Sequence, residues 1–348
     1  MKIVLPVVVL VMLCLSRVDT GAAQETLTLQ YARGFKVESL GGCKLVTIKP
    51  AWHKGEGGFH YLLVPMGQGV PAQHPSAQII RVPVKRIVTL STTQLAYIDA
   101  AGLTDRLVGL AGFDYVNTAS VRRRIEAGEL KSVGQFTRLN METLIDLAPD
   151  LILASASGSA YDVNPKLIEA GLPTILITDH LEHHPLGRLE WIKLMAMLFG
   201  TQDHADPLFD TIAARYQALA EKARTVRQRP KVIINTPFQG QWWIAKGESF
   251  VARYIADAGG DYLWRHVPGS GSTPMDVEAV YEQALAADIW LNTGTWKNRA
   301  DAETADPRLA LVPALKQSRV YNNNKRLNPH GGNDFWESGT LRPDMVLA

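Results

Sequence analysis

The stretch "DHADPLFDTIAARYQALAEKARTVR", residues 203–227, organises the rest of the sequence. It contains no glycine, and its lone proline, Pro207, stands near the start, where proline is tolerated. Its apolar residues recur at helical spacing: Leu208, Ile212, Tyr216, Leu219 and Ala223. About 25 helical residues would span roughly 37 Å, which is enough to connect two domains. We therefore predict one long linking helix over residues 203–228.

On both sides of this stretch, short apolar runs alternate with helical patterns, as is typical of parallel α/β sheets. The N-terminal side is expected to hold strands at 87–90, 107–110, 151–154 and 174–177, with helices at 93–101, 141–147 and 189–199. The C-terminal side is expected to hold strands at 232–235 and 289–292, with helices at 250–258 and 277–286. The prediction is an α/β fold with two lobes, residues 81–202 and 229–348, each built on a central, mostly parallel sheet.

The beginning of the chain predicts export. Lys2 is followed by an uncharged apolar run over 3–15 and by the small residues of 20–23, so residues 1–23 are interpreted as a signal peptide. No later segment reaches the roughly 18 apolar residues that a membrane helix needs. We expect a monomer in the periplasm that does not span the membrane. The net charge of +2 gives no electrostatic reason to expect nucleic acid as a partner.

Residues 24–80 differ from the rest of the chain in their sequence pattern, because β-rich runs are not followed by helical patterns. Apolar β-rich runs at 45–48 and 61–64 are separated by the glycine-rich turn 55–58, and 65–75 has the composition of a linker. A small N-terminal β extension followed by a linker is therefore expected. Cys43 is the only cysteine after the signal peptide, so no intramolecular disulfide is predicted.

Two segments share one layout. "NMETLIDLAPDLILAS" (140–155) and "DVEAVYEQALAADIWLNT" (276–293) each give a polar cap, a glutamate, an amphipathic helix, an acidic residue and a buried strand. Asn140 and Asp276 suit the cap position, and Glu142 and Glu278 suit the first helical turn, where the helix dipole favours a carboxylate. Each lobe is thus predicted to present one glutamate at an equivalent place.

The segments "VPVKRIVTLSTTQLAYIDAAGLTDRLVGLAGF" and "VGQFTRLNMETLIDLAPDLILA", together with the long helix, resemble the periplasmic substrate-binding proteins of ABC importers for iron-siderophore complexes, haem and cobalamin. The likeness runs from about residue 81 to the C-terminus. It implies two lobes bridged by a rigid helix, with the ligand held between them and delivered to an ABC permease. The segment 27–66 lies outside the usual core of that family, and "RPDMVLA" stops where such chains normally continue into a final helix.

The resemblance also implies how the protein meets its permease. In this family one surface glutamate on each lobe docks onto arginines of the permease, and the matching residues are Glu142 and Glu278. The alternative is that these two carboxylates only stabilise the starts of their helices.

Ligands of open α/β sheets bind at the carboxyl ends of the strands, so the loops at 91–94, 112–115, 155–161, 237–243 and 292–296 are the predicted lining. Their hydroxyls and aromatic rings suit a large, partly apolar ligand that carries many oxygens. The candidates in these loops are Thr92, Tyr115, Ser159, Trp242, Trp243 and Trp296.

In "FQGQWWIAKG" (238–247) a strand would point the two tryptophans to opposite faces. Gly240 and Gln241 predict a turn just before the pair, so Trp242 is expected to face the cleft and Trp243 to pack inside. Trp336 is a further aromatic candidate, for core or for rim.

Two arginines and a histidine complete the candidate site. A guanidinium can engage the anionic oxygens of ferric catecholates, ferric carboxylates or haem propionates in a bidentate way, which makes Arg138 and Arg326 candidates. A neutral hydroxamate complex would need neither. His330 could ligate haem iron, although a single loop histidine more often serves as a hydrogen-bonding residue.

Metal-based alternatives rest on "DHLEHHP", which holds His180, His183 and His184. A zinc site needs three or four converging ligands, and three histidines within five residues do not converge easily, so a polar loop before a helix is the favoured interpretation. The alternatives are an exported metal-dependent enzyme and a protein that captures a bare metal ion. No hydrolase elbow, zincin pair, phosphate loop or dinucleotide fingerprint is present. The sequence therefore predicts a binding protein for a ferric siderophore, with haem or cobalamin as alternative ligands, no enzymatic activity and no resident cofactor or metal.

Overall fold

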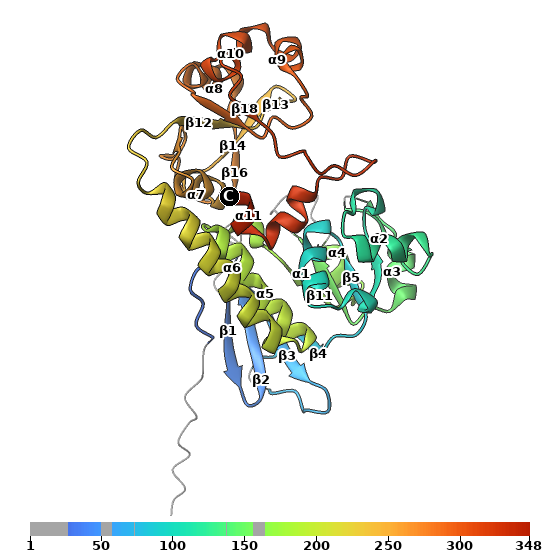
Figure 1. Ribbon diagram of the computed structural model, residues 1–348. Coiled ribbons are helices and arrows are strands. Elements are labelled where there is room, and N and C mark those ends of the chain that lie inside the picture. The colour runs from blue at the N-terminus through green and yellow to red at the C-terminus, as the bar shows by residue number, and fades with distance from the viewer. Residues whose placement is uncertain (1–26, 50–57, 73, 137, 156–163) are drawn as a thin grey trace, which may run out of the picture.

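The computed structural model describes residues 27–49, 58–72, 74–136, 138–155 and 164–348. These residues form two α/β lobes and an N-terminal β-sheet around two long helices, α5 (Pro185–Phe199) and α6 (Gln202–Ala223) (Figure 1). The N-terminal sheet and the C-terminal lobe lie at opposite ends of this helix pair. None of the described helices combines the length and the apolar character needed to cross a bilayer. The predicted signal peptide, residues 1–23, lies outside the described residues.

The predicted linking helix is confirmed as α6. It begins one residue before the predicted start and ends at Ala223, five residues before the predicted end. Its 22 residues extend over roughly 33 Å and lead from the N-terminal lobe to the C-terminal lobe (Figure 1). Of the predicted stripe, Ile212 and Tyr216 are buried, whereas Leu208, Leu219 and Ala223 are half-buried. The other buried residues of α6 are Ala205, Phe209 and Ala213.

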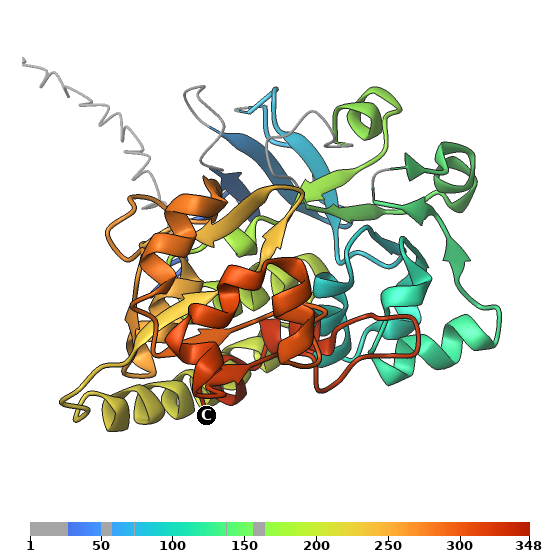
Figure 2. The same ribbon diagram turned by 90° about the horizontal axis from the view of Figure 1, so that it is seen from above.

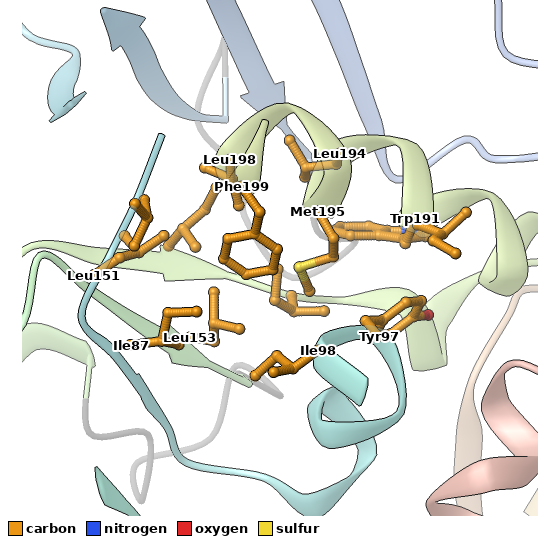
Figure 3. Packing of buried hydrophobic residues seen from close by; sticks show 14 of the residues in the cluster. Ile87, Tyr97, Ile98, Leu151, Leu153, Trp191, Leu194, Met195, Leu198 and Phe199 are labelled. Atoms are coloured by element: carbon orange, nitrogen blue, oxygen red, sulfur yellow. The ribbon is translucent and has the colours of Figure 1, made fainter. Parts of the chain in front are cut away.

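Helix α5 forms the centre of the larger core. Of its 15 residues 14 are buried, including the charged residues Arg188 and Glu190. Figure 3 shows Trp191, Met195 and Phe199 of α5 packed against side chains of the N-terminal lobe, while strands of the N-terminal sheet pass behind the helix. Because a helix buried on nearly every side must be covered by several neighbours, α5 requires both the lobe and the N-terminal sheet.

The N-terminal lobe is built on a five-stranded parallel sheet of order β11-β10-β5-β6-β7. Its strands are β5 (Ile87–Thr89), β6 (Leu107–Leu110), β7 (Lys131–Ser132), β10 (Leu151–Ala154) and β11 (Thr174–Leu176). Its helices are α1 (Leu95–Ala100), α2 (Ala119–Glu126), α3 (Met141–Leu147) and α4 (Asn164–Glu169), and β8 (Gly134–Gln135) pairs with β9 (Arg138–Leu139). Strands β6 and β7 are added on one side of β5, and β10 and β11 on the other. The strand order therefore reverses between β5 and β10, which is the switch point where such sheets bind ligands.

The C-terminal lobe repeats this plan with a four-stranded parallel sheet of order β15-β12-β17-β18. The strands are β12 (Lys231–Ile234), β15 (Asp261–Tyr262), β17 (Ile289–Leu291) and β18 (Val320–Tyr321). A second, antiparallel sheet joins β13 (Pro237–Phe238), β14 (Gln241–Ala245) and β16 (Ser272–Asp276). The helices are α7 (Phe250–Asp257), α8 (Val277–Ala284), α9 (Arg299–Ala305), α10 (Pro313–Lys316) and α11 (Pro343–Leu347). Here the switch point lies between β12 and β17.

The sequence predicted a small N-terminal β extension followed by a linker. The structure differs, because this segment is not separate from the lobe. Strands β1 (Phe35–Leu40), β2 (Cys43–Ile48), β3 (Phe59–Pro65) and β4 (Gln78–Val82) form one sheet, and the boundary expected between residues 80 and 81 falls inside β4. One face of this sheet belongs to the same core as the N-terminal lobe. Figure 2 shows the sheet beside that lobe when the molecule is seen from above. Cys43 is buried.

Two buried carboxylates hold residues 30–34, directly before β1, in place. Glu190 of α5 accepts hydrogen bonds from the backbone N–H groups of Gln30, Tyr31 and Ala32. Glu182 accepts from Arg33 and Gly34 and from the indole N–H of Trp191 at 2.8 Å. Burial raises the pKa of Glu182 even though these donors lower it. Residues 30–34 are therefore part of the folded unit.

Candidate ligand-binding cleft

Each parallel sheet has a switch point at which a ligand site is expected. The loop after β5 contains Ser91, and the loop after β10 begins with Ser155. On the other lobe, Asn235 follows β12 and Asn292 follows β17. The lobes touch just before β16, where a Cβ on Gly271 would lie 3.3 Å from Cδ2 of Leu181 of the N-terminal lobe.

Hydroxyl and amide groups organise the switch point of the N-terminal lobe. Gln94 is fully buried; it accepts a hydrogen bond from Thr89 and donates to Oγ of Ser155 at 3.3 Å. Oγ of Ser91 and Oγ1 of Thr93 lie 2.8 Å apart. These bonds tie the ends of β5 and β10 together and leave the predicted residue Thr92 half-buried at the rim. The predicted Ser159 lies outside the described residues.

The aromatic candidate of this lobe, Tyr115, is exposed. Tyr115 ends the short 3-10 helix η3 (Phe113–Tyr115), and 52% of it is accessible. The preceding Gly112 has a φ of 70°, so the chain turns sharply after β6. A side chain at Gly112 would also approach the Tyr115 ring to 3.2 Å. The sharp turn thus presents the tyrosine ring to solvent at the carboxyl end of β6.

The tryptophan pair is oriented opposite to the prediction. Trp242 is fully buried, whereas 46% of Trp243 is exposed. The positive φ angles fall on Gln239 and Gly240, so Gln241 already belongs to β14. The indole N–H of Trp242 donates to the carbonyl of Ile234 at 2.9 Å, which fixes that ring on the core side. The prediction that Trp242 faces the ligand is therefore wrong, and Trp243 is the exposed ring.

Trp243 belongs to an exposed face of the antiparallel sheet. Cross-strand partners share a face, and Phe238 pairs with Gln241, two residues before Trp243. Phe238 is 64% exposed. The amide of Asn235 donates to the backbone carbonyl of Trp243 at 2.8 Å, which ties this face to the end of β12. The predicted Trp296 is half-buried instead, with its ring edge-on to Trp290 at 5.4 Å.

Trp336 and Arg326 line a cavity of about 610 Å³ at the carboxyl ends of β12, β17 and β18. The volume lies within the range of small-molecule sites. Its remaining walls come from α7, α11 and residues 321–323. Arg326 forms an ion pair with Asp334 at 3.0 Å, and Trp336 is 45% exposed. A ligand anion would therefore compete with Asp334 for this guanidinium.

The structure does not bring the other two charged candidates into this cavity. Arg138 is exposed on the short strand β9, and His330 is exposed at the tip of the loop that follows β18. Neither is among the residues that line the cavity.

The histidine cluster diverges. Nδ1 of His184 accepts from the N–H of Leu186 and so caps α5, while His183 faces Glu248 at 3.8 Å. His180 lies in the short helix η4 (Asp179–Leu181). Across the described ranges, no three histidine, cysteine or carboxylate side chains are arranged to hold a metal ion. The two metal-based alternatives therefore find no site in that part of the chain.

The two predicted docking glutamates occupy equivalent places, at the second position of α3 and of α8. Asn140 and Asp276 cap these helices as predicted. Glu142 is exposed. Glu278, in contrast, forms a two-pronged ion pair with Arg308, at 2.5 and 2.9 Å.

The arrangement of two parallel sheets, a linking helix and a cleft agrees with the comparison to known proteins. A family described as "Periplasmic binding protein" matches residues 87–327, which is more than half of the chain. The chain belongs to this family. The match leaves out the whole N-terminal sheet, whose last strand ends at Val82.

Several solved structures share the fold of this periplasmic binding protein. A periplasmic haem-binding protein of Vibrio cholerae has a TM-score of 0.57 at 20% identity, covering 75% of this chain and 98% of that one. A protein of an Fe³⁺-hydroxamate transport system from Saccharomonospora viridis has a TM-score of 0.58 at 19% identity, covering 76% and 91%.

Among curated relatives, an uncharacterized lipoprotein of Methanocaldococcus jannaschii is 23% identical over 279 residues, covering 78% of this chain and 65% of its own length. A vitamin B12-binding protein of Vibrio parahaemolyticus is 33% identical over 107 residues, covering 30% of this chain and 35% of its own. The chain thus spans about two thirds or less of the length of these relatives.

Proposed function

We propose that this periplasmic binding protein captures a ferric siderophore in the cleft between its lobes and delivers it to the permease of an ABC importer. The observation that carries the proposal is that each lobe exposes an aromatic ring close to the end of a strand of its parallel sheet. Tyr115 follows β6 on one lobe, and on the other lobe the backbone of Trp243 is bound by Asn235, which follows β12. Aromatic faces can pack on the organic part of a metal chelate, while the hydroxyls after β5 can bind its oxygens. No chemistry on the ligand is needed for this role.

Within the siderophores, we favour a neutral hydroxamate complex over an anionic catecholate. Arg326 is already engaged by Asp334, and binding an anion there would break that pair. A guanidinium is most useful to an anionic ligand when its donors are free to form a fork. The likeness to the structure from an Fe³⁺-hydroxamate transport system agrees with this choice but rests on 19% identity.

Cobalamin is the second candidate ligand. The relatives with the higher local identities are vitamin B12-binding proteins, at 33% over 107 residues and 36% over 92 residues. Haem is a third, because a structural neighbour is a haem-binding protein. The aromatic rings on both lobes would suit any of these large, partly apolar ligands.

The proposal places the protein on the outer side of the cytoplasmic membrane. The predicted signal peptide supports this location, and relatives in M. jannaschii and Bacillus subtilis are named lipoproteins, the latter an ABC transporter substrate-binding lipoprotein. Glu142 and Glu278 would then contact the permease.

The test is a titration of tryptophan fluorescence with four probes: ferrichrome, ferric enterobactin, haem and cyanocobalamin. Ferrichrome is expected to quench the fluorescence with micromolar or tighter affinity, and iron-free ferrichrome serves as the matched control. Preferred binding of cyanocobalamin or haem would replace the siderophore as ligand and keep the binding role. The absence of binding to all four probes would overturn the proposal.

A further inference from the structure

Residues 322–337 form a segment that we call the interlobe strap. It leaves β18 of the C-terminal lobe and reaches across to the N-terminal lobe before the chain returns to α11 (Figure 1). At its start, the amide of Asn322 donates to the carbonyls of Gly294 at 2.7 Å and Trp296 at 3.4 Å. The strap therefore begins on the loop after β17, one of the two loops at the switch point of its own lobe.

The far end of the strap is fixed to the loop that carries Tyr115. The amide of Asn328 donates to the carbonyls of Asp114 at 2.8 Å and Val116 at 3.0 Å. The carboxylate of Glu337 accepts from the backbone N–H groups of Asn117 at 2.8 Å and Thr118 at 2.6 Å, and also from the hydroxyl of Thr118. Two strap side chains thus bind the residues on both sides of Tyr115.

The contact at Tyr115 itself is made by the backbone. A Cβ added to Gly332 would lie 2.4 Å from the carbonyl oxygen of Tyr115. Real Cβ atoms do not approach an oxygen so closely, so only glycine permits this contact. The strap and the loop therefore touch along their main chains.

The strap is also held together internally. Leu327 and Asn333 form a β-bridge, and Arg326 pairs with Asp334. The amide of Asn333 donates to Oδ1 of Asn323 at 3.0 Å. A segment with these internal bonds can transmit a displacement from one end to the other.

We propose that the interlobe strap positions the two ligand loops, one with Tyr115 and one with Trp296, and so holds the binding cleft at a fixed width. Asn328 and Glu337 are its positioning residues. The strap then ties the lobes together in addition to the α5–α6 pair, and opening the cleft requires the strap to detach from residues 114–118. A preorganised cleft loses less free energy on binding. This inference rests on the proposed function only where it concerns the ligand.

The test compares Gly332→Ala, Glu337→Gln and Glu337→Ala with the control Gly69→Ala. A Cβ on the exposed Gly69 would meet nothing within 4 Å. Hydrogen exchange at the amides of Asn117 and Thr118 reports directly on the bonds to Glu337. We expect exchange there to accelerate by about tenfold in Gly332→Ala and Glu337→Ala, less in Glu337→Gln, and not in the control. Asn328→Ala serves as a further variant should Glu337→Ala fail to fold.

Two more readouts separate positioning from mere stability. Spin labels on Lys131→Cys and Lys316→Cys, with Cys43 buried, report the distance between the lobes without any ligand. The distribution of that distance should broaden in the strap variants that remain folded, and the dissociation rate of a bound probe such as ferrichrome should rise about tenfold in them. Unchanged exchange and unchanged label distances in folded Gly332→Ala and Glu337→Gln would overturn the proposal. Failure of the wild type to bind any probe would count against the proposed function alone, because exchange and distances need no ligand.

Discussion

Trp242 and Trp290 stack with their ring centroids 5.7 Å apart and their planes 27° from parallel. Each indole N–H donates to a backbone carbonyl at the end of β12, Trp242 to Ile234 and Trp290 to Asn235. The stack therefore fastens β14 and β17 to the end of β12. Trp243 lies on the other face of β14 and takes no part in it.

The two neighbouring tryptophans should respond to mutation in opposite ways. Trp243→Ala removes an exposed ring, so it should leave the free energy of unfolding nearly unchanged and weaken binding of the chelate about tenfold or more. Trp242→Ala opens a cavity in the core and should cost roughly 3–5 kcal/mol. Urea unfolding and fluorescence titration on both variants make the comparison. Equal loss of binding at equal stability in the two variants would contradict the assignment of faces.

The pair of Trp242 and Trp243 also shows how much of the site could be predicted from the sequence. Alternation along a strand predicted that one ring would be buried and the other exposed, and this is confirmed. The choice between them depended on where the turn ends, and the turn was placed one residue too late. The left-handed conformation of Gln239, a residue without a strong turn preference, could not be predicted from the sequence.

The parallel strands at 107–110 and 151–154 and the helix at 141–147 were predicted at their observed bounds, because periodicity and capping are local signals. The β-rich runs at 45–48 and 61–64 are confirmed as parts of β2 and β3, but the packing of the N-terminal sheet onto the lobe and the strap were not predicted. Their positions depend on contacts such as Glu190 with Ala32 and Glu337 with Thr118, which join residues 158 and 219 positions apart. Buried carboxylates that accept main-chain bonds leave no periodic pattern in a sequence.

The hydrogen bonds that Glu190 accepts from residues 30–32 give a second prediction. Glu190→Ala would leave the N–H groups of residues 30–32 and the ammonium of Lys193 without their carboxylate. Such losses typically cost about 3 kcal/mol in a buried setting, and the first residues should become sensitive to protease. Glu221→Ala, which removes only an exposed pair with Arg224, is the control. Chemical unfolding and limited proteolysis measure both effects. Equal behaviour of the two variants would show that the hydrogen bonds to Glu190 contribute little to stability.

His184 predicts a dependence of stability on pH. Burial lowers its pKa to about 4, with the nearby charge of Arg253 acting in the same direction. In the unfolded chain the pKa of His184 is near 6.5, so at a pH between 6.5 and 4 the unfolded chain binds a proton that the folded chain does not bind. The contribution of neutral His184 to the free energy of unfolding is fully present above about pH 6.5 and is lost as the pH falls toward 4.

His184→Asn removes this titration and keeps a side-chain acceptor at the cap of α5. Between pH 7.5 and pH 5, the wild type should lose on the order of 1 kcal/mol more than the variant, which is less than the full shift implies because solvent screens a partly exposed ring. Urea unfolding at the two pH values gives the difference. Parallel losses would mean that His184 is not the titrating group.

The docking glutamates allow a prediction about transport. In a cell that depends on this importer, Glu142→Ala combined with Glu278→Ala should lower uptake of the chelate and leave its affinity for the purified protein intact, since neither carboxylate lies in the cleft. Glu282→Ala, an exposed residue of the same helix α8 as Glu278, is the matched control. Unchanged uptake would remove docking as the role of this pair.

Arg308 sharpens that experiment, because it already occupies the carboxylate of Glu278 and also pairs with Asp306. Docking onto an arginine of the permease would require Glu278 to exchange one guanidinium for another. Arg308→Ala frees the carboxylate, so uptake should stay constant or rise if exchange is the docking step. If Glu278 matters only through its bond to Arg308, then Arg308→Ala and Glu278→Ala should lower uptake equally. The single variants therefore distinguish a docking contact from a local ion pair at the surface of the C-terminal lobe.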